Sequence, residues 1–189
     1  RAEAMGDEED RTAAESLKQI AADLPFGAGI EGTGGLIKDE HARVLQHRSG
    51  QGEALTLASI IEREARIPDE RPVMAQVFLS RLAADMPLQA DPTVVYALRK
   101  AGRYDGNIRR TDLMVDSPYN TYRYAGLPPG PIANPGIDSI KAVVNPAPVN
   151  YLYFVASPAC DGTHLFAATL AQHNANVAQF NASQCAKGN

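Results

Sequence analysis

Two glutamates two positions apart, Glu62 and Glu64, lie in the segment LTLASIIEREA at residues 55–65. A carboxyl group is most effective as a general acid or base when its pKa lies near the working pH. On a helix, two positions correspond to about 200° of rotation, so the two carboxylates point to different sides. They therefore cannot form the facing pair of carboxylates that two-carboxylate glycosidases need.

Either glutamate is expected at an edge of the apolar face of this helix. That face is formed by Leu57, Ala58, Ile61 and Ala65. Desolvation beside a core would raise the pKa of a carboxyl group at such an edge. The alternative is a plain surface ion pair, because Glu62 and Arg66 are spaced i,i+4. Spacing alone favours this alternative.

Other kinds of chemistry have weaker support. The four histidines are His41, His47, His164 and His173. They show neither an HExxH motif nor another metal-ligand spacing, so we expect no metal. His173 falls in a predicted helix, where a packed or hydrogen-bonded histidine is commoner than a ligand. Neither Ser59 nor Cys160 and Cys185 has a recognisable base and orienting acid, which weakens nucleophilic catalysis.

The charge balance excludes one broad class of partner. The net charge is −4 and no concentrated Lys/Arg face is visible, which argues against nucleic acid. The composition suits a sugar polymer: Trp is absent, but seven Tyr and five Phe can supply stacking surfaces. No apolar run approaches the ~18 residues that span a bilayer. Because no signal peptide is present and the chain begins at Arg1, we expect an excised fragment.

Three helices are predicted in the middle of the chain, over residues 55–66, 69–85 and 93–100. Pro68 would end the first helix. Asp69 would cap the second, with Pro72 in its first turn, and Asp91-Pro92 would start the third in the same way. The apolar residues of the second helix recur at helical spacing, which predicts a buried face.

Residues 117–135 contain five prolines and can hardly form regular structure. A long, stiff loop of this kind is a candidate for function. The alternative is a packing loop that merely covers the core.

The last part of the chain predicts a helix over 137–145, strands over 151–156 and 163–167, and a helix over 169–183. Asp161-Gly162 in the connection indicates a β-hairpin. Helices with a small antiparallel sheet define an α+β class. If the last helix folds back over the sheet, it brings Cys185 towards Cys160 in the hairpin connection. A disulfide is therefore geometrically possible, and two unrelated thiols are the alternative.

Residues 1–52 differ from the rest of the chain. They combine an acidic opening with a Gly-rich run at 27–35, between short predicted helices over 15–24 and 38–47. The Gly-rich run is not a phosphate loop, because no Gly-Lys-Ser/Thr follows it. We therefore divide the chain into an atypical, partly flexible N-terminal segment, 1–52, and a folded domain, 53–189.

Several long segments resemble, in order, the YceG-like (MltG) family of endolytic murein transglycosylases. The matching segments are LTLASIIEREA at 55–65, ERPVMAQVFLSRL at 70–82, MPLQADPTVVYAL at 86–98, SPYNTYRYAGLPPGPIANPGIDSIKA at 117–142, NPAPVNYLYFVA at 145–156 and DGTHLFAATLAQHN at 161–174. The resemblance covers residues from about 54 to 180, and the segments are far more specific together than any single motif. The resemblance implies that 53–189 is a transglycosylase catalytic domain.

The resemblance also implies a reaction and a catalytic residue. The β-1,4 bond between N-acetylmuramic acid and N-acetylglucosamine would be cut without water, leaving a 1,6-anhydro end. Glu62, in the ASIIERE segment, would act as acid and then as base, which requires a pKa raised towards neutrality. No metal or organic cofactor is implied, and no second carboxylate is needed to activate water.

A glycan cleft built by the QADPT and YNTY…GLPPGPIANP segments is a further implication. The candidate substrate-binding residues are Gln89, Asp91, Thr93, Asn120, Thr121, Tyr122 and Asn134. Their side chains suit sugar hydroxyl and acetamido groups, and the neighbouring prolines reduce the entropy lost on binding. Two positions depart from the family pattern: Ser80, where Asn is usual, and Ala90, where Ser or Thr is common. Both departures concern affinity more than activity.

Peptidoglycan glycan strands are the implied partner, and peptidoglycan synthases are further candidates. The parent protein is expected at the periplasmic face of the inner membrane, through an anchor that this soluble fragment lacks. Two alternatives remain: a hydrolase with the same cleft, and a non-catalytic peptidoglycan-binding or scaffold module. A glutamate partly buried in a groove lined by 117–135 would favour the enzyme. An exposed Glu62 paired only with Arg66 would favour the scaffold.

Overall fold

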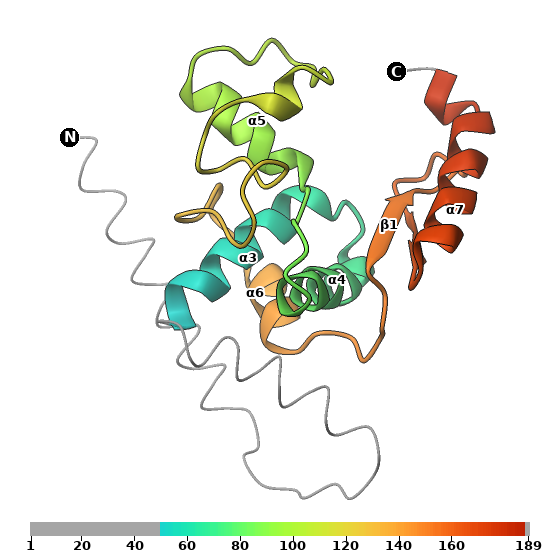
Figure 1. Cartoon of the computed structure of the whole chain (residues 1–189). Helices are drawn as coiled ribbons and strands as arrows, with labels where there is room; N and C mark the ends of the chain where they lie inside the picture. Colours follow the sequence, from blue (N-terminus) through green and yellow to red (C-terminus); the bar gives the residue numbers. More distant parts are fainter. Residues whose placement is uncertain (1–49, 188–189) are drawn as a thin grey trace, which may run out of the picture.

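The computed structural model describes residues 50–187, with side chains from 52 to 186. Its elements are α3 (Gly50–Glu64), η1 (Pro68–Glu70), α4 (Arg71–Ala83), α5 (Asp91–Lys100), η2 (Asp112–Met114), α6 (Ile137–Val144), β1 (Tyr153–Ala156), β2 (His164–Ala167), α7 (Leu170–Ala182) and η3 (Cys185–Lys187). Helices with one two-stranded antiparallel sheet confirm the α+β class (Figure 1). The helices predicted over 15–24 and 38–47, like His41 and His47, lie outside the described residues. No helix within the described range is long and apolar enough to cross a membrane.

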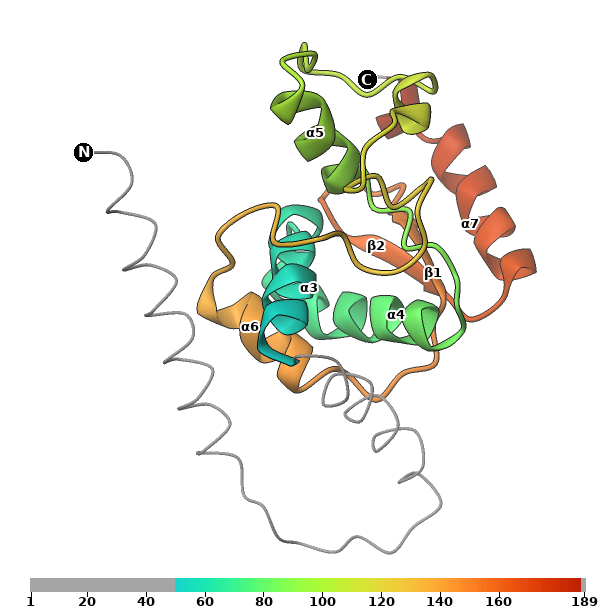
Figure 2. The same cartoon turned by 60° about the vertical axis from the view of Figure 1, so that its left-hand side comes forward.

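The hydrophobic core lies where α3, α4 and α6 meet, and α5 packs on α3 from another side (Figures 1 and 2). Its largest fully buried side chains include Leu57, Ile60, Ile61, Met74 and Phe78. Burial of each such side chain stabilises the fold by roughly 1.5–3 kcal/mol. Every residue from 56 to 61 is buried, so α3 has neighbours all round. The end of α3, which bears both glutamates, is therefore held firmly.

Two predicted helix caps are wrong. Asp69 does not cap α4, because the 3₁₀ turn Pro68–Glu70 precedes that helix and its N-cap residue is Glu70. The Glu70 carboxylate is used elsewhere: it accepts from the backbone N–H of His164 at 2.8 Å and lies 2.7 Å from Nδ1 of that residue. Asp91, the predicted cap of α5, is instead its first helical residue. Its carboxylate is thereby left for a contact outside the helix.

The β-hairpin and α7 form the second part of the fold. β1 and β2 pair antiparallel, with Phe154 opposite Phe166, which confirms the predicted hairpin. Thr169 and Gln172 form a reciprocal capping box at the start of α7. The ring of Phe154 packs edge-on against Phe78 of α4, with centroids 5.8 Å apart. The hairpin is therefore attached to the helical core through aromatic packing.

A disulfide joins Cys160, in the hairpin connection, to Cys185 in η3, with Cα atoms 5.6 Å apart. The bridge links the hairpin connection to the segment that follows α7. In the chain-entropy model, a cross-link of this loop length contributes about 3–4 kcal/mol at most. In this model the bridge stabilises the fold by restricting the unfolded chain. In the folded chain it connects the segment after α7 to the hairpin connection.

The proline-rich loop, residues 117–135, is fixed to the helical core by buried hydrogen bonds. The hydroxyl of Ser59 on α3 accepts from the backbone N–H of Ile132 at 2.9 Å. Asn120 is fully buried, and its side-chain amide donates to two nearby backbone carbonyls at 2.8 and 2.9 Å. The loop therefore covers part of the core, as the packing alternative proposed, and also forms a rigid wall beside the end of α3.

Candidate active site

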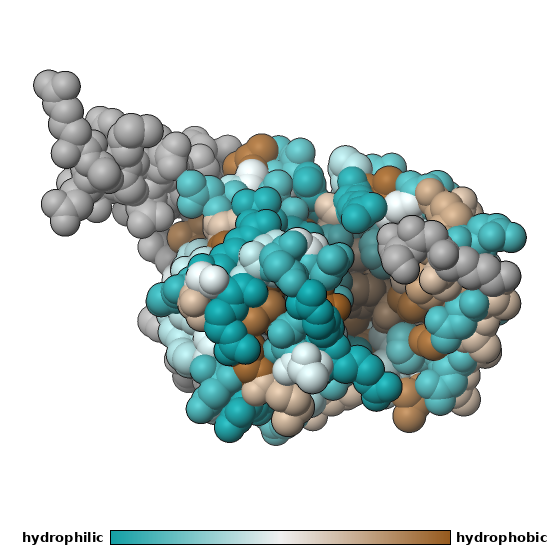
Figure 3. Space-filling view, turned by 90° about the horizontal axis from the view of Figure 1, so that it is seen from above, coloured by the Kyte–Doolittle hydropathy of each residue, from teal (hydrophilic) through white to brown (hydrophobic). Residues whose placement is uncertain are grey.

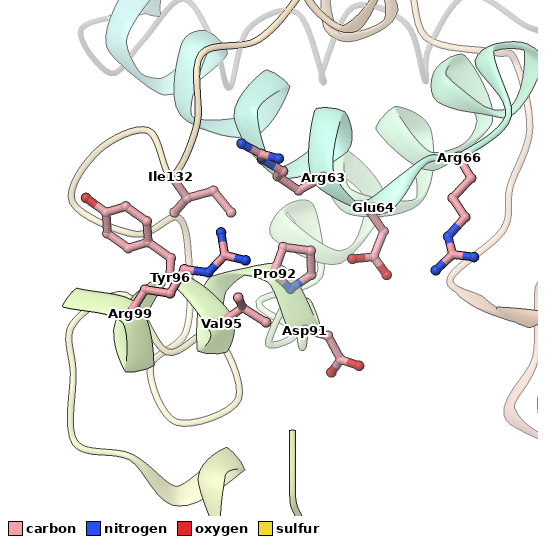
Figure 4. A pocket seen from close by; sticks show the side chains of 9 residues that line it. All are labelled: Arg63, Glu64, Arg66, Asp91, Pro92, Val95, Tyr96, Arg99 and Ile132. Carbon is pink, nitrogen blue, oxygen red and sulfur yellow. The ribbon is translucent and has the colours of Figure 1, made fainter. Parts of the chain in front are cut away.

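A cleft of about 310 Å³ lies between the end of α3 and α5. The residues that line it include Arg63, Glu64, Arg66, Asp91, Tyr96, Arg99 and Ile132 (Figure 4). Because Ile132 belongs to the proline-rich loop, three segments far apart in the sequence wall this cleft. Viewed from above, the surface is hollowed between the part of the molecule that bears α5 and the part that bears α7 (Figure 3). The volume lies at the lower end of the range of ligand pockets.

Glu64, the last residue of α3, is partly buried, and its carboxyl group points towards the start of α5 (Figure 4). Desolvation, with the charge of Asp91 adding to it, raises the pKa of this carboxyl to about 8, against the opposing charge of Arg81. Glu64 is therefore mostly protonated at neutral pH and close to titrating, as a general acid must be. The expectation that burial raises the pKa of one of the two glutamates is confirmed for Glu64.

Glu62 has a different environment on another side of α3. Its Oε2 accepts from the Ser139 hydroxyl at 2.6 Å and from the Gly136 N–H at 3.1 Å, and its Oε1 lies 3.8 Å from the Arg71 guanidinium. Desolvation is the largest single influence, but these hydrogen bonds and nearby cations together lower the pKa of Glu62. The expected rise in pKa is therefore wrong for Glu62. Its ion pair is with Arg71, and not with Arg66 as the surface alternative proposed.

The contacts of Glu62 place a carboxylate at the start of α6. Gly136 is the N-cap residue of that helix, and Ser139 lies in its first turn. A negative charge is favoured there by the helix dipole and by the unpaired N–H groups of the first turn. A Cβ on Gly136 would lie 3.4 Å from Oε2, at the limit of ordinary van der Waals contact. Glu62 thereby joins α3 to α6.

Of the predicted substrate-binding residues, Asp91 lines the cleft and Tyr122 adjoins it. The Tyr122 hydroxyl donates to Oδ1 of Asp91 at 2.5 Å. Burial and this hydrogen bond raise the pKa of Tyr122, so its phenol remains a donor. Arg81 on α4 is buried and donates to three backbone carbonyls, and its charge acts on both Glu64 and Tyr122. These four side chains form one electrostatically coupled group.

Thr93, Asn120 and Thr121 are buried and are not among the residues that line the cleft. The hydroxyls of Thr93 and Thr121 lie 2.9 Å apart, and Thr121 also accepts from the N–H of Ala90 at 3.0 Å. Asn120 accepts at its side-chain oxygen from the N–H of Tyr122. The three side chains therefore join the loop to the start of α5, which positions the hydrogen-bonded pair of Asp91 and Tyr122.

The last two predicted residues, Gln89 and Asn134, are exposed. Gln89 has φ of +51°, a conformation that is costly for a residue with a side chain, and its N–H donates to the carbonyl of Thr121. Asn134 lies two positions after Ile132, in the stretch that leads into α6. Neither side chain belongs to the wall of the cleft.

Sequence reasoning missed three cleft arginines, Arg63, Arg66 and Arg99, although their spacing carried a signal. Arg63 and Arg66 lie one before and two after Glu64. Arg99 follows Asp91 by eight positions, and residues four apart on a helix are neighbours on its surface. Once Asp91 is assigned to a cleft, the same face of α5 therefore predicts Arg99 beside it.

The described histidines have packing roles. His164 contacts Glu70 as noted above, and His173 stacks on the ring of Tyr153 with centroids 5.3 Å apart. Across the portion of the chain that the structure describes, no group of three or more His, Cys, Asp or Glu side chains could hold a metal ion.

A cleft that holds a carboxyl group of raised pKa, a second carboxylate and several cations is typical of an acid–base enzyme. The sequence profile described as the YceG-like family matches residues 13–179, and the chain belongs to this family.

Two proteins similar to this chain have the same name. A Bacillus subtilis (strain 168) protein named endolytic murein transglycosylase is 42% identical over 147 residues, which are 78% of this chain and 39% of the relative. A Streptococcus pneumoniae (strain D39) protein of the same name is 39% identical over 67% of this chain and 23% of the relative. The crystal structure of a yceG-like protein from Listeria monocytogenes has a TM-score of 0.62 and 44% identity, covering 74% of this chain and 44% of that one. The chain thus spans less than half the length of each.

Proposed function

We propose that this chain is the catalytic part of a lytic murein transglycosylase in which Glu64 is the general acid and then the general base. The observation that carries the proposal is the carboxyl group of Glu64, which lines the cleft and has a pKa raised to about 8. Similarity to two endolytic murein transglycosylases supports the substrate class, the glycan strands of peptidoglycan.

The reaction follows from one group with two protonation states. Protonated Glu64 donates its proton to the glycosidic oxygen between N-acetylmuramic acid and N-acetylglucosamine, and the bond from that oxygen to C1 breaks. The N-acetylglucosamine end leaves as an alcohol. The Glu64 carboxylate then accepts the proton of the muramic C6 hydroxyl as this oxygen bonds to C1. The 1,6-anhydro ring forms without water, and Glu64 is again protonated.

The neighbours of Glu64 support both halves of this cycle. The negative charge of Asp91 raises the pKa of Glu64 and would stabilise the positive charge that develops at C1. The hydrogen bond from Tyr122 holds the Asp91 carboxylate in place. Arg81 opposes the rise in pKa, so the proton stays transferable near neutral pH.

The sequence-based assignment of the acid to Glu62 remains a competing prediction. A lowered pKa leaves Glu62 ionised at neutral pH, without a proton to donate. Glu62 also accepts hydrogen bonds from the start of α6 and is not among the residues that line the cleft. Both observations favour Glu64, and variants of the two residues can separate the assignments.

A hydrolase is the second candidate function, because Asp91 lines the same cleft as Glu64. A second carboxylate can activate a water molecule or attack C1 directly. Oδ1 of Asp91 already accepts a hydrogen bond from the Tyr122 hydroxyl and is not free to accept a proton from water, which favours the transglycosylase. A scaffold without activity would gain nothing from a protonated carboxyl in a cleft.

Product chemistry tests the choice between these enzymes. Purified glycan strands treated with the protein should yield fragments that end in 1,6-anhydromuramic acid, lighter by one water than hydrolytic ends. The C6 hydroxyl is then the nucleophile. Fragments of intermediate length should appear early, since the named relatives are endolytic. Mass spectrometry of the products gives both results, and mainly reducing muramic ends would assign the chain to the hydrolases.

The pH dependence of kcat/KM tests which glutamate is the acid. The free enzyme must hold a proton on this residue, so activity should be present below pH 8 and lost as the pH rises through about 8, where Glu64 titrates. If Glu62 were the acid, activity should be lost as the pH rises through a value below 4.5, because the pKa of Glu62 is lowered from that ordinary value. Initial rates at subsaturating strand concentration from pH 4 to pH 10 decide between the two.

Peptidoglycan lies outside the cytoplasmic membrane, so we place the parent protein at the extracytoplasmic face of that membrane. The Cys160–Cys185 disulfide suits an oxidising compartment of this kind. Peptidoglycan synthases, which make the strands that this enzyme would cut, are the partners to test there.

A further inference from the structure

Three arginines in the cleft form no ion pair with the carboxyl groups of the cleft, although the charge of Arg63 also acts on Glu62. Arg63, Arg66 and Arg99 are exposed, and none of them belongs to an ion pair among residues 52–186. The guanidinium groups of Arg63 and Arg99 lie beside the Ile132 side chain, whereas Arg66 lies on the other side of Glu64 (Figure 4). Two arginines from different helices, α3 and α5, therefore line the cleft on the side of Ile132.

The acidic groups of the cleft leave these charges available. Glu64 is mostly neutral at pH 7, and Asp91 accepts a hydrogen bond from Tyr122. The guanidinium of Arg99 lies 5.0 Å from the centroid of the Tyr104 ring, a cation–π contact that helps to order it. Inside a concave surface, the field of unpaired cations is stronger than on an open one.

We propose that Arg63 and Arg99 bind a carboxylate carried by the sugar next to the scissile bond. Guanidinium groups pair with carboxylates through charge-assisted, often bidentate hydrogen bonds. The inference rests on the proposed function, because muramic acid brings a carboxylate on its lactyl group. In a bare strand that lactyl carboxylate is free, and in a substituted strand it is amidated by a stem peptide that has carboxylates of its own.

Such a site would link recognition to catalysis. A carboxylate bound beside Glu64 adds negative charge, which favours the protonated form of the acid before cleavage begins. Strands of N-acetylglucosamine alone lack this group. The two arginines would thus discriminate peptidoglycan from other β-1,4-linked amino-sugar polymers.

The test compares three tetrasaccharides by calorimetry at low ionic strength. They are the bare N-acetylglucosamine–N-acetylmuramic acid repeat, the same repeat with stem peptides, and chitotetraose. Binding is measured in whichever variant, Glu64→Gln or Glu62→Gln, does not cleave, or in the unsubstituted chain if that is inactive. Arg63→Gln combined with Arg99→Gln removes the site. Arg110→Gln is the matched control, because Arg110 is exposed and is not a cleft residue.

A carboxylated ligand should bind about tenfold more tightly than chitotetraose, and the double variant should lose this preference while the control keeps it. Preference for the bare repeat identifies the lactyl carboxylate, and preference only for the substituted repeat identifies the stem peptide. Equal binding of all three ligands, or a preference that survives in the double variant, would overturn the inference. Failure of the proposed function is distinct, because it appears as an uncleaved strand whatever the arginines bind.

Discussion

Glu64→Gln should lower the rate of strand cleavage by at least ~10²–10⁴-fold, the usual contribution of general acid–base assistance. Glutamine keeps the size and shape of the side chain but can neither donate nor accept the catalytic proton. The fold should survive, because Glu64 is mostly uncharged at neutral pH. In the unfolded chain Glu64 ionises near its ordinary value of 4.5, but in the fold its pKa is about 8, so the unsubstituted chain loses stability as the pH rises from 4.5 to 8. The variant should therefore gain in melting temperature over this range, with most of the gain already present at pH 7 and all of it above pH 8. Initial rates at pH 7 and thermal melts at pH 4, pH 7 and pH 9 measure both effects.

Glu62→Gln is the matched control, on the same helix two positions away. It removes the ion pair with Arg71 and the negative charge at the start of α6, but an amide oxygen can still accept from Ser139 and Gly136. We expect most activity to remain and stability to fall by about 1 kcal/mol. If this variant is inactive and Glu64→Gln is active, the sequence-based assignment to Glu62 stands and the proposal for Glu64 fails.

The helix that bears both glutamates is predictable from the sequence, but the side that faces the cleft is not. Apolar residues in 55–65 indicate a buried helix. Because every residue from 56 to 61 is buried, the hydrophobic pattern of α3 does not predict which side of the helix faces solvent. Desolvation raises the pKa of Glu62, but hydrogen bonds from Ser139 and Gly136, 77 and 74 residues away, help nearby cations to lower it. Only the packing of α6 against α3 brings these groups together, and no local pattern reports it.

The polar residues of the loop show the same limit. The segment YNTY predicts a sugar-binding surface because Asn and Thr can contact hydroxyl groups. In the structure, Asn120 and Thr121 turn inward and satisfy backbone groups. Side chains of these types often bond to nearby backbone, so polarity alone does not separate a ligand contact from a support. Of the segment, Tyr122 reaches the cleft through its hydrogen bond to Asp91.

Arg81→Met should destabilise the fold by roughly 3–5 kcal/mol, because a buried hub of hydrogen bonds is lost. The side chain donates to the carbonyls of Leu152 at 2.7 Å, Leu88 at 2.8 Å and Pro87 at 3.3 Å. Methionine fills a similar volume but leaves these acceptors without their donor. Since one of them precedes β1 and the others precede α5, the hairpin and the wall of the cleft should loosen together. Thermal melting should show a decrease of about 10 °C.

Arg110→Met controls for the loss of a positive charge, because Arg110 is exposed, and it should change stability by less than about 0.5 kcal/mol. A second readout separates a catalytic influence of Arg81 from a structural one. The charge of Arg81 lowers the pKa of Glu64, so its removal should move the high-pH loss of kcat/KM above pH 8 in whatever fraction stays folded. If Arg81→Met melts at the same temperature as the unsubstituted chain, the hydrogen bonds of Arg81 do not stabilise the fold as proposed. If kcat/KM of the variant is still lost at about pH 8, the charge of Arg81 does not act on the pKa of Glu64.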